Sequence, residues 1–198
     1  MTTLLLKIKH HCPRIWNCIE HVNGVLVGMR FPGRLEISKR VLKDSSGGDF
    51  IYSLIEEREI PKLKEFLCGL SEDTIKYFAP HGFESTNLIK LFNNKGFVLM
   101  KVTDKNEPDA IKGYFLLRIF CNGKAFHGLI VGEDIRNRGI GSRMWQIASI
   151  ICKDLGLKMF ATISKNNTPS IKSASNGCST RIIKELADDY LLIRCEPL

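Results

Sequence analysis

The chain has 198 residues, of which 44% are hydrophobic and 25% are charged, so the length predicts one domain with a short appendage and the composition suffices for an apolar core. No run of 18 apolar residues occurs, so we expect no membrane-spanning helix, and the first apolar run is shorter than we expect of a secretory signal. The seven cysteines are odd in number and scattered, as is typical of reduced intracellular thiols. We therefore expect a cytoplasmic protein.

The formal net charge is +8, and residues 1–48 hold eight lysines and arginines against three acids. Such a basic surface suits nucleic acid, anionic lipid or a ligand that carries phosphate, and charge alone does not choose among them. The sequence contains no clustered basic and aromatic strand pattern, so no nucleic-acid partner is expected.

Residues 3–29 show helical periodicity, which Pro13 divides into two helices. A helix on the anionic inner surface of a membrane and a helix packed on its own domain or on a second subunit both fit this pattern. The segment "KDSSGGD" (43–49) predicts a linker, so we divide the chain into a basic helical extension (1–48) and a second domain (49–198). His10, His11, Cys12, Cys18 and His21 gather in the extension, but no CxxC pair accompanies them, and no metal is expected.

After the linker the patterns predict strands and helices in alternating groups. Strands are predicted over 50–57, 96–103, 113–120, 124–132, 157–164, 179–186 and 189–197, with polar turns over 104–112 and 121–124. Helices are predicted over 61–70, 71–78, 85–94, 140–155 and 168–177.

The segment "EDIRNRGIGSRM" (133–144) joins the strand around residue 130 to the long helix. Glycine lets a backbone approach a ligand closely, and the free N–H groups of a helix's first turn attract an anion. Arg136, Arg138 and Arg143 would add positive charge, so the turn predicts a phosphate ligand. The dinucleotide fingerprint requires glycine where Met144 stands, and a phosphate-binding P-loop requires lysine after Gly141, so neither of these motifs is present.

The segment "VGEDIRNRGIG" resembles the pyrophosphate-binding segment of the GNAT (GCN5-related N-acetyltransferase) acyltransferases, which carry Arg/Gln-x-x-Gly-x-Gly/Ala after their fourth strand. "SKNNTPSIKSASNGC" (164–178) resembles the family's second segment, Asn-x-x-Ser followed by Gly-Phe, although here Gly177 precedes Cys178. The resemblance covers roughly residues 50–198. It implies an α/β fold with a mixed, mostly antiparallel sheet of six or seven strands flanked by helices, in which the fourth and fifth strands splay apart.

The resemblance also implies acetyl-CoA as the co-substrate, with no metal, and direct transfer of an acetyl group to a primary amine. It assigns pyrophosphate binding to the turn, pairing with the pantetheine arm to the fourth strand, and further contacts to the helix at 168. The cofactor-binding residues so implied are Leu129, Ile130, Val131, Arg136, Arg138, Gly139, Ile140, Gly141, Ser142, Arg143, Asn167 and Ser170.

Three residues are candidates for catalysis. His127 matches the position at which some members of the family place a catalytic histidine, and a neutral histidine can take a proton from an ammonium. Glu133 is a second choice for this base. Many members use a tyrosine on the helix after the fifth strand to protonate the thiolate, but residues 168–177 contain none, and Ser173 stands near that place. This departure leaves open a module that binds CoA without turnover.

The stretch "YFAPHGFE" (77–84) lies in the region that sets the acceptor in this family, and its candidate substrate-binding residues are Tyr77, His81, Phe83 and Glu84. It loosely resembles a branch with members in bacterial surface-polysaccharide gene sets. That resemblance implies a small-molecule amine, such as an amino sugar that is linked to a nucleotide or a lipid. A protein or peptide amine is the alternative acceptor.

Overall fold

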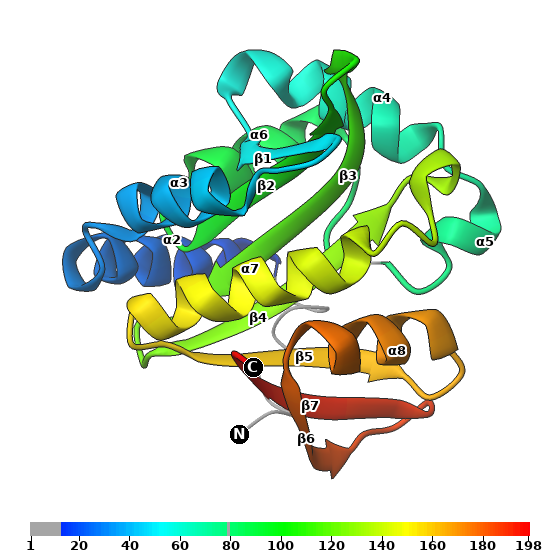
Figure 1. Ribbon diagram of the computed structural model, residues 1–198. Coiled ribbons are helices and arrows are strands. Elements are labelled where there is room, and N and C mark those ends of the chain that lie inside the picture. The colour runs from blue at the N-terminus through cyan, green and yellow to red at the C-terminus, as the bar shows by residue number, and fades with distance from the viewer. Residues whose placement is uncertain (1–12, 79) are drawn as a thin grey trace.

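A computed structural model describes residues 13–78 and 80–198, and its centre is one seven-stranded sheet (Figure 1). The strand order is β1-β2-β3-β4-β5-β7-β6, and only β4 and β5 run parallel to each other. The strands are β1 (Phe50–Leu54), β2 (Phe97–Asp104), β3 (Glu107–Ile119), β4 (Lys124–Val131), β5 (Lys158–Ser164), β6 (Ser179–Glu185) and β7 (Tyr190–Glu196). The expected mixed, mostly antiparallel sheet is confirmed.

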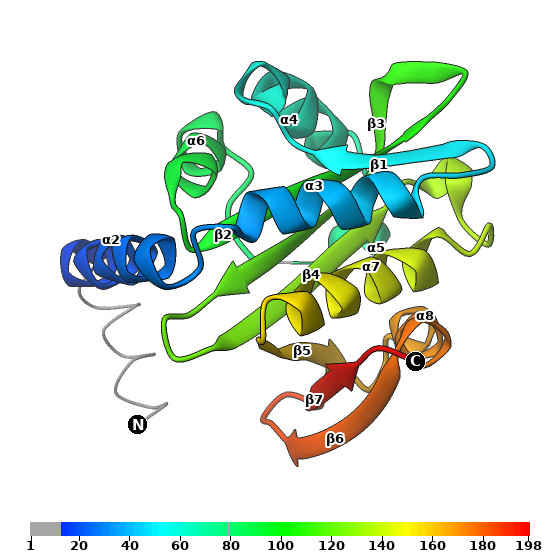
Figure 2. The same cartoon turned by 60° about the vertical axis from the view of Figure 1, so that its left-hand side comes forward.

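Helices flank both faces of this sheet. On one face, α3 (Arg34–Ser45) and α7 (Ile140–Asp154) lie side by side, and α8 (Thr168–Gly177) packs on α7 (Figure 2). On the other face lie α4 (Ile60–Cys68) and α6 (Ser85–Asn93), with the short α5 (Glu72–Ile75) beside them. The other elements of the described residues are α2 (Pro13–Arg30) and two 3-10 turns, η1 (Glu57–Glu59) and η2 (Glu133–Ile135). None of the helices in these described ranges is long and apolar enough to cross a membrane.

The central strands are apolar on both faces, which gives the domain two cores. Phe115 and Leu117 of β3 face α3 and α7, whereas Tyr114 and Leu116 face α4 and α6, since successive strand side chains point to opposite sides. All four are almost fully buried. Strands buried on both faces explain why β2 and β3 show nearly continuous hydrophobic runs.

Part of the N-terminal extension packs directly on the sheet. Val41 and Leu42 of α3 belong to the main core, and Arg40 forms an ion pair of 2.8 Å with Asp154 of α7. The linker predicted over 43–49 is instead the end of α3 and a tight turn into β1, in which Ser46 Oγ accepts a hydrogen bond from the backbone N–H of Tyr52 (2.9 Å). The division of the chain at residue 48 stays a prediction.

The helix α2 lies across the ends of β2 and β3 and keeps an apolar stripe in solvent. Ile15, Val22 and Met29 are 53%, 55% and 68% exposed, while Val27 on the opposite side is fully buried. The predicted contact with a membrane surface or a second subunit through the N-terminal helices stays a prediction, and residues 1–12 lie outside the described part of the chain.

The polar turn predicted over 104–112 is wrong. β2 and β3 form a hairpin that turns at Lys105 and Asn106, and β3 already begins at Glu107. The first three residues of β3 are exposed, so the hairpin extends beyond the core and its polar sequence gives no strand signal.

Candidate functional site

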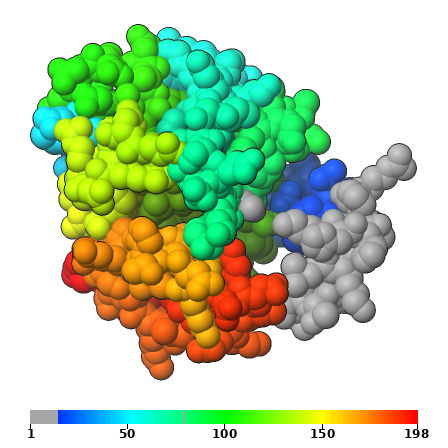
Figure 3. Space-filling model, turned by 90° about the vertical axis from the view of Figure 1, so that its right-hand side faces the viewer, coloured from blue at the N-terminus to red at the C-terminus, as the bar shows by residue number. Residues whose placement is uncertain are grey.

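A large cavity lies where β4 and β5 separate. The two strands pair only between Lys124–Phe126 and Lys158–Phe160, and beyond this point they diverge. The space between them opens into a cavity of about 1160 Å³. Figure 3 shows the surface hollowed between the orange α8 region and the green segment around α5. The expected splay of the fourth and fifth strands is present, and it creates the site.

The start of α7 forms one wall of this cavity. Gly139 occupies the N-cap with φ 76°, a left-handed conformation that glycine adopts without steric cost, and no side chain caps the helix there. The N–H of Arg143 bonds to the carbonyl of Gly139 (3.0 Å), whereas Ile140, Gly141 and Ser142 have no earlier helical carbonyl to bond. Their N–H groups and the positive end of the helix dipole therefore suit an anion in the cavity.

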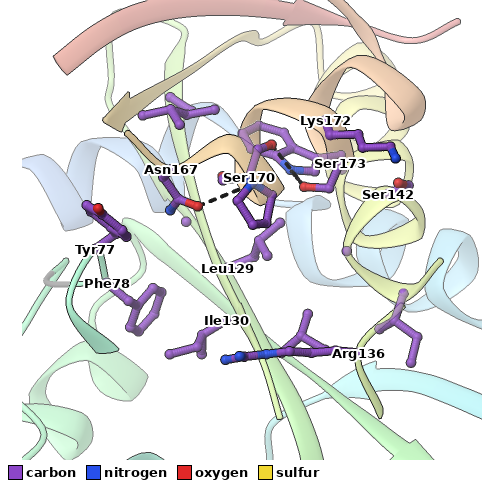
Figure 4. Close-up of a pocket in the computed structure, with 18 of the residues that line it drawn as sticks. Tyr77, Phe78, Leu129, Ile130, Arg136, Ser142, Asn167, Ser170, Lys172 and Ser173 are labelled. Carbon is purple, nitrogen blue, oxygen red and sulfur yellow. Dashed lines mark hydrogen bonds between the residues drawn. The ribbon is translucent and has the colours of Figure 1, made fainter. Parts of the chain in front are cut away.

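The start of α8 faces this wall (Figure 4). Asn167 caps α8, since its Oδ1 accepts a hydrogen bond from the backbone N–H of Ser170 (3.2 Å), and both residues line the cavity. The two helices touch closely at Gly177, where an added Cβ atom would lie 2.2 Å from the carbonyl oxygen of Ser142. This contact holds α8, which belongs to the second predicted cofactor segment (164–178), against the start of α7, where the first one ends.

β4 supplies an open edge to the cavity. Leu129, Ile130 and Val131 all line it, and on their other side they pair with β3. Because β5 has already diverged, the backbone groups of β4 that point toward β5 have no strand to bond with among residues 13–78 and 80–198. An extended ligand could pair with this edge as an added strand does.

The three arginines of the turn point in different directions. Arg136 lines the cavity, and its Nη2 donates to Thr74 Oγ1 (2.5 Å). Arg138 instead forms an ion pair with Asp49 (2.7 Å), and Arg143 donates to Gln146 (2.6 Å) and to the carbonyl of Ser45 (3.1 Å). Arg138 and Arg143 therefore use their side chains for contacts with other parts of the protein.

Sequence reasoning missed Lys172, which lines the cavity from α8. The sequence could have indicated this position. One face of α8 lines the cavity with residues at helical spacing: Pro169, Lys172 and Asn176.

His127 lies on the α7 side of β4, next to the indole of Trp145, and lines the cavity. Its Nδ1 lies 3.1 Å from the carbonyl oxygen of Leu116, and because a carbonyl only accepts, Nδ1 carries the proton. Nε2 is buried and finds no hydrogen-bond partner among the described residues. Burial lowers the pKa of His127 from 6.5 to about 4, so the ring is neutral at pH 7 with a bare lone pair on Nε2.

The carboxylate of Glu133 is hydrogen-bonded to residues at the start of α5. It accepts hydrogen bonds from the Ser71 hydroxyl (2.5 Å), the Ser71 N–H (3.1 Å) and the Thr74 hydroxyl (2.6 Å). These bonds, the Ser71 hydroxyl first, lower the pKa of Glu133 to about 2. Such a carboxylate stays ionised, and its geometry suits the attachment of α5 to the turn that follows β4.

Ser173 connects α7 and α8. Its hydroxyl donates to the carbonyl of Ser170 (3.0 Å) and accepts from the indole N–H of Trp145 (3.2 Å). Ser173 lines the cavity, and its hydroxyl proton is already used within the helix.

Of the four residues predicted to bind the acceptor, Tyr77 lines the cavity. His81 and Phe83 belong to an aromatic cluster, in which His81 Nε2 lies 3.1 Å from the hydroxyl of Tyr114. Glu84 precedes α6 and accepts a hydrogen bond from Asn87 (2.7 Å).

Other residues that the sequence did not single out also line the cavity, among them Asp73, Thr74, Phe78, Pro80 and Tyr190. Phe78 and Pro80 lie within the stretch that was singled out. Tyr190 comes from β7, opposite Ser164 of β5, and no local pattern could have placed it there.

Only some of the histidines and cysteines near the N-terminus lie in the described part of the chain. His10, His11 and Cys12 lie outside the described residues. Within 13–78 and 80–198, no three His, Cys, Asp or Glu residues come together in a way that could hold a metal ion.

Comparison with known proteins identifies the fold and the family. No curated protein sequence matches the chain significantly. The solved structures it resembles include the GNAT domain of S. lividans PAT (16% identity, TM-score 0.62, 78% of this chain and 93% of that one) and spermidine N-acetyltransferase from Vibrio cholerae in complex with CoA and spermine (12%, 0.61, 75% and 95%). A third is ribosomal-protein-S5-alanine acetyltransferase from Vibrio fischeri (14%, 0.60, 77% and 94%).

At these identities the structures show a shared fold alone. The model of the acetyltransferase (GNAT) family matches residues 65–177, which are more than half of the chain and include both walls of the cavity. The chain belongs to the GNAT acetyltransferase family.

Proposed function

We propose that the protein transfers an acetyl group from acetyl-CoA to the primary amine of a small molecule, with an amino sugar as the acceptor class. The observation that carries this proposal is the cavity at the splay of β4 and β5, which has the uncapped start of α7 in its wall. The spermidine N-acetyltransferase of similar fold holds CoA and spermine, which supports the same pair of ligand classes here.

The residues present fit acetyl-CoA. The N–H groups of Ile140 to Ser142 would hold the pyrophosphate, and Arg136 and Lys172 bring positive charge to the same cavity. The free edge of β4 at Leu129 to Val131 would pair with the amides of the pantetheine arm. When bound, acetyl-CoA supplies a thioester carbonyl carbon that an amine can attack.

The amine must lose a proton to form the amide, and His127 is the proposed acceptor. Its Nε2 lone pair has no partner among the described residues, and the bond from Nδ1 to Leu116 holds this tautomer. Because the pKa of His127 is about 4, the ring does not keep a proton at pH 7, and the proton passes on to water in the open cavity.

The departing thiolate needs a proton donor. Ser173 stands near the expected place, but its hydroxyl would first have to leave the carbonyl of Ser170. Tyr190 offers a second hydroxyl in the same cavity, so we propose both as candidates. Tyr190→Phe and Ser173→Ala separate them, since the true donor's variant loses kcat at unchanged acetyl-CoA affinity.

The acceptor side of the cavity mixes polar and aromatic groups. Asp73, Thr74 and Tyr77 bring a carboxylate and hydroxyls beside the ring of Phe78. This combination supports a hydroxylated ring such as a sugar, because hydroxyls need hydrogen-bond partners and the ring's apolar face needs an aromatic one.

The first test is calorimetric titration of the protein with acetyl-CoA and CoA. We expect micromolar binding to the wild type and its loss in Gly139→Trp, where the indole would project from the start of α7. Gly123→Trp is the matched control, because Gly123 also has a positive φ (82°) and open space around its missing Cβ but lies in the turn between β3 and β4. Equal loss in both variants, or no binding to the wild type, would refute the cofactor site.

The second test is release of CoA with a panel of amines. Turnover with amino sugars and not with peptide amines supports the proposed acceptor class. The reverse result points to a protein amine, and binding of acetyl-CoA without any turnover points to a module that senses CoA.

A further inference from the structure

A row of aromatic and arginine side chains crosses the sheet on the face opposite α7. The register places one residue from each of six neighbouring strands in line: Phe97, Arg118, Phe126, Phe160, Arg194 and Arg181. Side chains alternate between faces, so all six share the face of Gly128. The sequence shows no such cluster because each residue comes from a different strand.

In the half of this row that contains Phe97 and Arg118, other side chains of the protein already occupy the space around the arginine. The guanidinium of Arg118 lies 5.1 Å from the ring centroid of Phe120 and 5.5 Å from that of Trp16. Glu20 of α2 accepts a hydrogen bond from it at 2.6 Å. This half therefore has its own cation and its own counter-charge.

The other half offers an aromatic pair. The rings of Phe126 and Phe160 are stacked, with centroids 5.8 Å apart and an interplanar angle of 28°, and both are partly exposed. The ammonium of Lys124 lies 5.8 Å from the ring centroid of Phe160. An exposed aromatic pair with a cation beside it suits a planar ligand that carries negative charge.

Basic groups surround this pair. Lys158 lies opposite Lys124, and Arg181 lies opposite Arg194. Glu196 pairs with Arg194 at 2.7 Å, yet the buried Nε of Arg194 still has no acceptor among the described residues. The four cations exceed this one acid, so the aromatic pair lies in a field that attracts phosphate.

The pair is also continuous with the cavity. Gly128 and Thr162 stand two residues beyond Phe126 and Phe160 on the same strands and the same face, and both line the cavity. Two residues of strand span about 6.6 Å. A ligand held by the pair would therefore reach the cavity with a group at its other end.

We propose that the acceptor carries a nucleotide, that the Phe126–Phe160 pair stacks on its base, and that Arg194 and its neighbours bind its phosphates while the amine enters the cavity. The proposal rests on the proposed function, since it names the carrier of the same acceptor. The open half of the row is four strands wide, about 14 Å, which suits one nucleoside diphosphate better than a longer single strand of RNA.

The test is titration with ADP, GDP, CDP, UDP and dTDP in the presence of saturating CoA, which occupies the cofactor's own nucleotide site. We expect at least one nucleoside diphosphate to bind. We expect Phe160→Ala and Arg194→Gln each to weaken it at least tenfold, while Phe160→Tyr, which keeps the ring, stays within threefold. Phe97→Ala is the matched control from the filled half of the row and is expected to change binding less than twofold.

The outcomes separate this proposal from the proposed function. Binding of CoA to every variant reports that the fold and the cofactor site are intact. If no nucleoside diphosphate binds, or if Phe160→Ala binds it as well as the wild type does, the nucleotide proposal is wrong while acetyl transfer stands. If a single-stranded oligoribonucleotide binds tighter than every nucleotide and depends on Phe160, the face serves nucleic acid and the proposal is again wrong. If the wild type does not bind CoA, the proposed function fails, and the nucleotides are titrated alone.

Discussion

The imidazole of His127 and the indole of Trp145 meet edge to face, with ring centroids 4.5 Å apart. The same indole donates its N–H to Ser173. One line of contacts thus joins β4, α7 and α8, and it holds the buried imidazole of the proposed proton acceptor in position beside the cavity. The burial that isolates Nε2 of His127 also makes the folded protein sensitive to acid.

Replacing His127 with phenylalanine should flatten the dependence of stability on pH. The pKa of His127 is about 4 in the folded state and near 6.5 when unfolded, so the unfolded chain binds more protons between these values. The free energy of unfolding of the wild type should therefore fall as the pH drops from 6.5 to 4, with a contribution from His127 of at most about 1.4 kcal/mol per pH unit.

Urea denaturation of both proteins at pH 7, 6 and 5 measures this difference. Burial also lowers the pKa of His81, but His81 is present in both proteins and its contribution cancels. Parallel curves for the two proteins would show that His127 already carries a proton in the folded state at pH 6.

Glu133→Gln should disturb acceptor binding more than chemistry. The carboxylate joins Ser71 and Thr74 of the α5 segment to the turn after β4, and the adjoining Tyr77 lines the cavity. With the amine that gives the fastest CoA release, we expect KM for the amine to rise and kcat to fall less than tenfold. Glu72→Gln, the neighbouring acid at the start of α5, is the control and should match the wild type. A loss of kcat of a hundredfold or more would identify Glu133 as the base.

Gly177→Ala should separate α8 from α7. A Cβ atom there would lie 2.2 Å from the Ser142 carbonyl oxygen and 2.7 Å from Trp145 Cβ, and neither a helix backbone nor a Cβ can yield without movement of the helix. Overpacking of this kind costs about 1–3 kcal/mol, and CoA affinity should fall with it because Ser142 lines the cavity. Gly33→Ala has open space and an ordinary φ of −78°, so its denaturation midpoint should stay near that of the wild type. A Gly177→Ala protein as stable as Gly33→Ala would contradict the close contact.

The local parts of the site could be predicted from the sequence. The glycine turn and the starts of α7 and α8 are each encoded within a few residues, because backbone conformation and capping depend on immediate neighbours. The two helices begin at Ile140 and Thr168, as predicted, although the residue that caps α8 is Asn167, one position before the predicted helix.

The directions of side chains could not be predicted, because they depend on elements far along the chain. Arg138 turns toward Asp49 and Arg143 toward Ser45, both of them in a segment that the sequence presented as a linker. Tyr190 reaches the cavity only because β7 inserts between β5 and β6. The basic and aromatic face was invisible for the same reason.

Removing the carboxylate of Glu20 alone should loosen α2 from the sheet more than removing it together with the guanidinium of Arg118, its ion-pair partner. Arg118 is enclosed by Trp16, Phe97 and Phe120, and burial lowers its pKa even though Glu20 opposes this. Glu20→Gln leaves the enclosed guanidinium without its counter-charge, and we expect a loss of about 1–3 kcal/mol.

In Glu20→Gln with Arg118→Met no charge is left unpaired, and an unbranched side chain still fills the space between the rings, so this double variant should be more stable than Glu20→Gln alone. Urea denaturation gives the free energies, and limited trypsin digestion after Arg30 reports the release of α2. If the destabilisation of the double variant instead equals the sum of the two single ones, the ion pair contributes no coupling, and other contacts hold α2, among them those of Asn23 and Val27.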